Sequence, residues 1–315
     1  MADLLPIIRR LHEGVYADVF VVQSPTGERA CKISHEPRLA PRSTRPAFAS
    51  TGIVFATGSL GSFHPDPNEL LAREHEVLLR VKHPHVATVF DFGAHPTEAD
   101  RSYLVTTYLD APSWRTRLLA KAPPSIDEYM QFARTVATLH EEHAWMHGDL
   151  KPDNVVGDMR SAMMMIDPSA GMYRHDDKGA LLTAFTTPSY NPFVIESDVP
   201  ALASMLAELV CGTPLVPEGD DPSVPSIRER SAITLAASAR AWCDDSRRVG
   251  QHRFVRRFLR MKLPRELRPE IPARLEDVIL HGLGFAIRNN TVERVPAIVT
   301  PRAWCSQVDQ ALADA

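Results

Sequence analysis

The sequence predicts an α+β fold with a small β-rich N-terminal lobe, residues 1–110, and a larger, mainly helical C-terminal lobe, residues 111–315. Two observations predict it. β-branched and aromatic residues dominate strand-like runs in the first part, whereas apolar residues recur at helical spacing after residue 125. At 315 residues, the chain is long enough for one large domain with two lobes or for two small domains.

Composition argues against a nucleic-acid-binding, membrane-spanning or disulfide-rich protein. The net charge of −4 gives no electrostatic reason to expect nucleic-acid or membrane-surface binding, and no apolar run reaches the length of a bilayer span. The four cysteines lie far apart without a CxxC pair, so neither a disulfide framework nor a zinc site is expected. These features favour a cytoplasmic protein with reduced thiols and leave its oligomeric state open.

The N-terminal lobe begins with a predicted hairpin. Its strands are the runs 15–22 and 29–34, and the turn SPTG at 24–27 joins them. The following stretch, 36–67, is rich in proline and small residues, so we expect an inserted flap in which GIVFATG, 52–58, forms a short strand.

A helix is predicted next, with Asn68 as its N-cap and an end near Lys82. Glu74 falls in the middle of its apolar stripe, whereas Glu76 lies nearly opposite. An inward carboxylate needs a cation because burying it unpaired is costly. The sequence therefore predicts that Glu74 faces inward and meets a basic side chain.

Strands at 86–92 and 102–109 complete the predicted N-terminal lobe. In the C-terminal lobe, Ser125 and Glu128 have the spacing of a capping box at the start of a helix. Asp198 and Gly212 are the expected cap and stop of the next helix. Helices are predicted after residue 125 and at 199–211, 228–243, 251–262, 273–286 and 301–313.

The strongest chemical signal is HGDLKPDNVV, residues 147–156, a polar loop between a helix and an apolar strand. It resembles the catalytic loop of eukaryotic-type (Hanks-type) Ser/Thr protein kinases, and the chain resembles a divergent bacterial member. The resemblance implies a bilobal protein-kinase-like fold and phosphoryl transfer from ATP. It also implies that Asp149 accepts the substrate's hydroxyl proton, Lys151 steadies the transferred phosphate and Asn154 binds Mg²⁺.

Two more motifs fit this resemblance. Asp167, in MMMIDPSAG, ends an apolar run and resembles the aspartate of the DFG motif, which binds magnesium. Here Asp-Pro-Ser replaces Asp-Phe-Gly, and proline fixes φ, so we expect a stiffer segment. Lys32, in ACKI, resembles the lysine that contacts the ATP α- and β-phosphates. Glu74 stands ten residues before Pro84, as the family's glutamate stands before its HPN-like turn.

The nucleotide-covering loop is eroded. LHEGVYADVFVV, 11–22, resembles the glycine-rich loop, but only Gly14 and Val19 match it. SYLVTTYLD, 102–110, resembles the strand before the hinge, which implies Thr106 as gatekeeper and an adenine edge bound by backbone near Tyr108 and Leu109.

Regulatory features are also implied. Gly148 replaces the arginine that binds an activation-loop phosphate in many kinases, so we expect activity without that phosphate. The 36–67 insert is either a disordered flap or a segment that regulates the site. The arginine-rich stretch 247–268 is either a solvated helix face or a docking surface for an acidic partner.

Three functions remain open at this point. The first is an ATP- and Mg²⁺-dependent Ser/Thr protein kinase with a protein substrate, favoured by Thr187 in FTTPSY. The second is a pseudokinase that binds a nucleotide or a partner without transfer, suggested by the eroded loop. The third is a small-molecule kinase of the aminoglycoside or fructosamine type, against which Lys151 and Thr187 argue.

Overall fold

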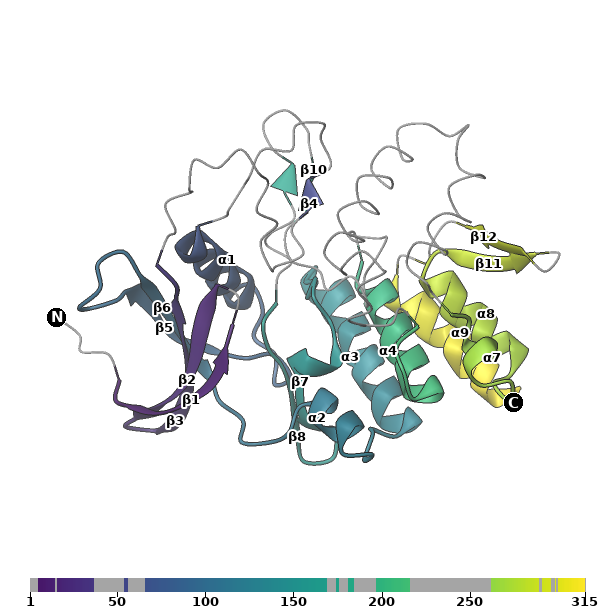
Figure 1. Cartoon of the computed structure of the whole chain (residues 1–315), viewed down its shortest axis with the longest axis horizontal. Helices are drawn as coiled ribbons and strands as arrows, with labels where there is room; N and C mark the ends of the chain where they lie inside the picture. Colours follow the sequence, from purple (N-terminus) through teal and green to yellow (C-terminus); the bar gives the residue numbers. More distant parts are fainter. Residues whose placement is uncertain are drawn as a thin grey trace, which may run out of the picture.

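The structure is a computed structural model, and its two lobes lie side by side (Figure 1). The five-stranded sheet and helix α1 form one lobe, and the remaining helices form the other. The described residues are 5–14, 16–36, 54–55, 66–168, 174–175, 181–183, 197–215, 262–288, 291–295, 298 and 300–314.

The N-terminal sheet is antiparallel and has the strand order β1-β2-β3-β6-β5. Its strands are β1 (Ile7–Glu13), β2 (Ala17–Ser24), β3 (Gly27–Ser34), β5 (Val89–Ala94) and β6 (Ser102–Thr107). The predicted hairpin is confirmed as β2–β3. Strand β1 was not predicted, because every residue along it is exposed and no alternation between buried and exposed positions marks it.

Helix α1 (Pro67–Leu79) packs on this sheet, and its cap differs from the prediction. Asp66, not Asn68, is the N-cap, and its carboxylate accepts a hydrogen bond from the Asn68 backbone N–H at 2.9 Å. Pro67 occupies the first turn, where its missing N–H costs nothing. The Asn68 side chain instead binds the backbone oxygen of Asp100, at 2.8 Å, and the hydroxyl of Ser34. The helix ends before the predicted Lys82.

The predicted short strand within 52–58 is present as β4 (Val54–Phe55). It pairs with β10 (Leu181–Thr183), which also pairs with β9 (Arg174–His175). The insert therefore meets the chain that follows the predicted metal-binding aspartate, at the top of the view in Figure 1. The rest of 37–65 lies outside the described residues.

The C-terminal lobe contains helices α3, α4, α8 and α9 in one packed group (Figure 1). Ser125 caps α3 as predicted, since its hydroxyl accepts from the Glu128 N–H at 3.1 Å, and Gly212, at φ 74°, ends α4. The elements are α2 (Trp114–Leu119), α3 (Ile126–His143), 3-10 helix η1 (Pro152–Asn154), β7 (Val155–Asp158), β8 (Ala162–Met165), α4 (Val199–Cys211), α7 (Pro264–Leu267), α8 (Ala273–Gly282), β11 (Phe285–Arg288), β12 (Thr291–Arg294) and α9 (Pro301–Ala313).

The helix predicted over 273–286 is too long. Helix α8 ends at Gly282, and β11 then pairs with β12. Gly284 adopts φ 79°, a left-handed conformation that ends the helix although apolar residues continue beyond it. The helix predicted at 228–243, nearly all of the helix predicted at 251–262, and residues 247–261 of the arginine-rich stretch lie outside the described residues.

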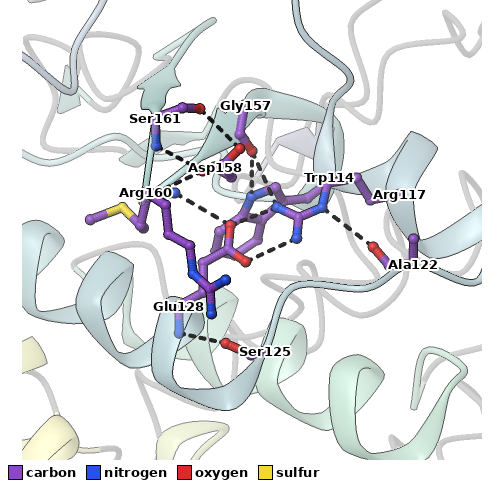
Figure 2. A network of polar contacts seen from close by, with 10 residues as sticks. Trp114, Arg117, Ala122, Ser125, Glu128, Gly157, Asp158, Arg160 and Ser161 are labelled. Carbon is purple, nitrogen blue, oxygen red and sulfur yellow. Dashed lines mark hydrogen bonds and ion pairs between the residues drawn. The ribbon is translucent and has the colours of Figure 1, made fainter.

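A polar network joins α2, α3 and the β7–β8 hairpin (Figure 2). The two terminal nitrogens of Arg117 donate to the two carboxylate oxygens of Glu128, at 2.6 and 2.9 Å. The Trp114 indole N–H donates to the Gly157 backbone oxygen at 3.2 Å, and the Met159 N–H donates to Glu128. Glu128, the glutamate of the predicted capping box, therefore pairs with Arg117. The network also holds β7, the strand that follows the catalytic loop, against α2.

Candidate active site

One buried carboxylate anchors the catalytic loop. Asp198, at the start of α4, is 1% exposed and accepts hydrogen bonds from the backbone N–H groups of His147 and Gly148, each at 2.8 Å. His140 Nε2 lies 2.9 Å from the same carboxylate. Burial opposes ionisation, but these partners, His140 first, hold the pKa of Asp198 below its ordinary value. Asp198 therefore ties the backbone of the catalytic loop to the start of α4.

Gly148 is shaped for this bond pattern. Its φ is +83°, in the region that residues with a β-carbon rarely adopt. An arginine at this position would strain the backbone as it stands. The backbone conformation therefore favours glycine at position 148. The same residue also removes the side chain that would bind an activation-loop phosphate.

His147 connects the catalytic loop to the segment before Asp167. Its ring is fully buried and its Nε2 lies 2.8 Å from the Ile166 backbone oxygen. Burial lowers the pKa of His147, so the ring is neutral near pH 7 and Nε2 is the atom that donates. The loop and the end of β8 are thus held at a fixed separation.

The three residues predicted to act from the loop lie together. Lys151 Nζ is 2.8 Å from Asp149 Oδ2, and the Asn154 side-chain nitrogen donates to the Asp149 backbone oxygen at 2.9 Å and to its carboxylate at 3.3 Å. Burial would lower the pKa of Lys151, but the Asp149 carboxylate outweighs it and the pKa is raised. Lys151 is therefore a cation beside a carboxylate at the mouth of the loop.

Lys32 joins three parts of the chain: its own strand β3, helix α1 and the segment after β8. Its ammonium lies 2.7 Å from the Glu74 carboxylate on α1 and 2.5 Å from Asp167 Oδ1, which follows β8. Lys32 and Glu74 are 6% and 2% exposed. Burial opposes the charge of Lys32, but Asp167 and then Glu74 outweigh it and raise its pKa well above the ordinary value. The inward orientation predicted for Glu74 is confirmed by these contacts.

Asp167 adopts an unusual backbone conformation. Its φ of +59° is left-handed and uncommon for a residue with a side chain. The segment is anchored just before it, since the Met165 backbone exchanges hydrogen bonds with His85 and Ala87 of the loop after α1, at 2.8 and 3.1 Å. Burial disfavours ionisation, but Lys32 outweighs it and lowers the pKa of Asp167. An ionised carboxylate is therefore turned toward Lys32.

The family described as protein kinase domain matches residues 59–262, more than half of the chain. The chain belongs to the Hanks-type protein kinase family. Among curated proteins, the SNF1-related protein kinase catalytic subunit alpha KIN12 of Arabidopsis thaliana is 25% identical over 170 residues, or 50% of this chain. The match spans only about a third, 33%, of that relative's length.

Solved structures give the same fold. A mutant form of the Mycobacterium tuberculosis PknI kinase domain matches with a TM-score of 0.55, and the match covers 97% of this chain and 94% of that one at 19% identity. The unmutated PknI kinase domain gives a TM-score of 0.53 over the same coverage, also at 19% identity. These matches take in both lobes. The predicted bilobal kinase fold is therefore confirmed.

The family match starts at residue 59, so Lys32 and the segment before it lie outside it. The role expected of Lys32 rests instead on its contact with Glu74. Gly14 forms a tight turn in which its N–H donates to the Ala17 oxygen at 3.0 Å, and a β-carbon on Gly14 would lie 2.2 Å from that oxygen. Val19 pairs with Lys32 across β2 and β3, so this loop residue lies beside the lysine.

The hinge residues occupy the expected end of β6. Thr106 is 7% exposed. The Tyr108 hydroxyl accepts from Arg9 of β1 at 2.6 Å, which ties the edge of the sheet to the hinge. The Leu109 side chain packs on the main core, and its backbone oxygen accepts from the Ala111 N–H at 2.9 Å. Thr187 lies outside the described residues.

Two contributors were missed by the motifs: His147 as a buried link and Tyr16 as a partner of Glu74. The Tyr16 hydroxyl donates to Glu74 Oε2 at 3.0 Å across 58 positions of sequence, and no local pattern signals it.

Over the described residues, no helix is long and apolar enough to cross a membrane. Within the same part of the chain, no group of three or more His, Cys, Asp or Glu side chains could hold a metal ion.

Proposed function

We propose that this chain is an ATP- and Mg²⁺-dependent Ser/Thr protein kinase. The observation that carries the proposal is the Lys32 ammonium, bound to Glu74 at 2.7 Å and to Asp167 at 2.5 Å. A buried lysine held between two carboxylates is a fixed positive charge beside a carboxylate able to bind metal. That combination suits the neutralisation of phosphate oxygens.

The residues present fit a magnesium ion bound together with phosphates. Asn154 is 4% exposed and its side-chain nitrogen is the donor to Asp149, which leaves the amide oxygen as the atom for a cation. Within the described part of the chain that oxygen accepts no hydrogen bond, and the lowered pKa of Asp167 keeps its carboxylate ionised. Mg²⁺ is usually bound through one or two protein oxygens plus phosphate oxygens, so no larger cluster is required. When bound, it neutralises charge that develops on the phosphate oxygens.

In the proposed reaction, Asp149 orients the hydroxyl of a substrate serine or threonine and accepts its proton. The hydroxyl oxygen bonds to the γ-phosphorus as the bond from that phosphorus to the β–γ bridging oxygen breaks. Lys151, 2.8 Å from Asp149, supplies positive charge next to the attacking oxygen. Lys32 holds the α- and β-phosphates, and Thr106, Tyr108 and Leu109 border the adenine.

Nucleotide binding without transfer is the second candidate. Asp-Pro-Ser in place of Asp-Phe-Gly, and the loss of two loop glycines, favour it. The retained geometry around Asp149 and Lys151 favours transfer.

Phosphorylation assays on the purified chain separate these functions. Labelled ATP and Mg²⁺ are supplied with a generic protein substrate and with a panel of small metabolites. We expect labelled protein that is lost in Asp149→Ala and Asp167→Ala but kept in Glu98→Ala, a control carboxylate that binds Arg101 away from the cleft. A labelled metabolite would favour a small-molecule kinase. Nucleotide binding with no labelled product at all would favour the pseudokinase.

We also propose that the protein acts in the cytoplasm on a protein substrate. The described cysteines, Cys31, Cys211 and Cys305, are buried free thiols. Burial raises their pKa values, to about 12 for Cys31, which keeps the thiols protonated and unreactive. Fractionation of cells followed by detection of the protein tests this location.

A further inference from the structure

Tyr16 reaches from the turn between β1 and β2 to Glu74 on helix α1. Its hydroxyl donates to Glu74 Oε2 at 3.0 Å, and its ring centre lies 6.0 Å from Lys32 Nζ. Its backbone oxygen accepts from the His35 N–H at 2.8 Å, and its ring packs against the main hydrophobic core. The side chain is therefore held from both ends and joins the turn after β1 to α1.

All three N–H donors of Lys32 can be taken up by carboxylate oxygens of Glu74 and Asp167. A lysine ammonium has three N–H donors, and Lys32 has three carboxylate oxygens within reach: Glu74 Oε1 at 2.7 Å, Glu74 Oε2 at 2.8 Å and Asp167 Oδ1 at 2.5 Å. If Lys32 turns one N–H donor toward a phosphate oxygen, one of these carboxylate oxygens loses its hydrogen bond to Lys32. Glu74 is 2% exposed, so water cannot readily replace the lost donor.

The hydrogen bond from Tyr16 to Glu74 can persist when Lys32 turns to a phosphate. The Tyr16 hydroxyl donates to Glu74 Oε2, an oxygen that also accepts a hydrogen bond from Lys32. While Lys32 turns to a phosphate, the Tyr16 hydroxyl can keep that oxygen satisfied and the glutamate side chain in place. Glu74 can then go on holding Lys32 through Oε1.

We propose that Tyr16 is a positioning residue, which holds Glu74, and through it Lys32, in the orientation that binds the nucleotide's phosphates. This inference rests on the proposed function and assigns one more residue to the same site. Tyr16 would act on the phosphate end of the nucleotide, because its hydroxyl donates to Glu74, the residue that holds Lys32. If Tyr16 instead kept phosphates away from Lys32, removal of its hydroxyl would tighten the binding of a nucleotide.

The test is calorimetric binding of ADP with Mg²⁺, and separately of adenosine, to the whole chain and to Tyr16→Phe. We expect ADP to bind roughly three- to tenfold more weakly to Tyr16→Phe, in line with the typical net contribution of one hydrogen bond. Adenosine, which has no phosphate, should bind as before. Tyr103→Phe is the matched control, since it also removes a hydroxyl bound to a carboxylate, Asp91 at 2.8 Å, but this pair joins β6 to the edge strand β5.

Double substitution tests the route through Glu74. In a Glu74→Ala background, Tyr16→Phe should cause no further loss of ADP affinity, because its partner is gone. Unchanged or tighter ADP binding by Tyr16→Phe alone would overturn the inference while leaving the proposed function standing. Equal weakening of ADP and adenosine would also overturn it, since a general packing role would then explain the effect. A wild-type chain that binds no ADP would refute both.

Discussion

The bond between Asp198 and the catalytic loop gives the sharpest quantitative prediction. In Asp198→Asn, one side-chain oxygen is kept and the other becomes an NH₂ group. If the kept oxygen serves His147 and His140, the NH₂ group faces the Gly148 N–H, with which the carboxylate bonds at 2.8 Å. One hydrogen bond to a charged acceptor is lost and two donors face each other in a site that is 1% exposed. We expect a loss of about 2–4 kcal/mol in the free energy of unfolding.

Urea denaturation at neutral pH measures this loss. Asp309→Asn is the control, because Asp309 pairs with Arg134 at 2.6 Å where both side chains are about half exposed, and such pairs contribute within about 1 kcal/mol. If Asp198→Asn is no more destabilising than Asp309→Asn, the view that Asp198 supports the loop is wrong.

Acidification provides a second check on Asp198. Its pKa in the folded chain is lowered from the ordinary value of 3.8. A lowered pKa gives stability that is present above 3.8 and is lost as the pH falls through the folded-state value. The difference in unfolding free energy between wild type and Asp198→Asn should therefore be full at neutral pH and shrink below about pH 4. A difference that is constant over this range would contradict the assignment.

Three further substitutions have expected outcomes that urea denaturation measures. Gly148→Ala should cost about 1–2 kcal/mol, because φ is +83° there, and it should lower kinase activity as well. Gly282→Ala should be destabilising by about 1–3 kcal/mol despite alanine's higher helix propensity, since the new β-carbon would lie 2.7 Å from Ala203 and from Trp304. Glu128→Gln should cost about 1–3 kcal/mol, because it breaks a two-bond pairing with Arg117 of which Glu128 is only 10% exposed.

Local chemistry explains what could be predicted without a structure. Helix periodicity alone separated Glu74 from Glu76, because a 100° step per residue decides which carboxylate joins the apolar stripe. Ser125 and Gly212 could be recognised because a cap acts within one turn of its own helix.

Competition between equivalent local signals explains the errors. Asp66 and Asn68 are both good N-caps, and Asp66 takes the position because the Asn68 side chain binds residues 34 and 100, which are distant in sequence. Apolar residues continue past Gly282, so periodicity extended α8 into β11, whereas the backbone turns at Gly284 and pairs with β12.

The sequence by itself determined the family, the order of the two lobes and the residue types available for phosphoryl transfer. A short catalytic loop carries its identity within ten contiguous residues, 147–156. Only the tertiary structure decided that Lys32 is shared between Glu74 and Asp167, and that Tyr16 supplies the extra donor. These contacts join chain segments 42 or more positions apart, and their energies depend on distances and burial that arise only when those segments pack together.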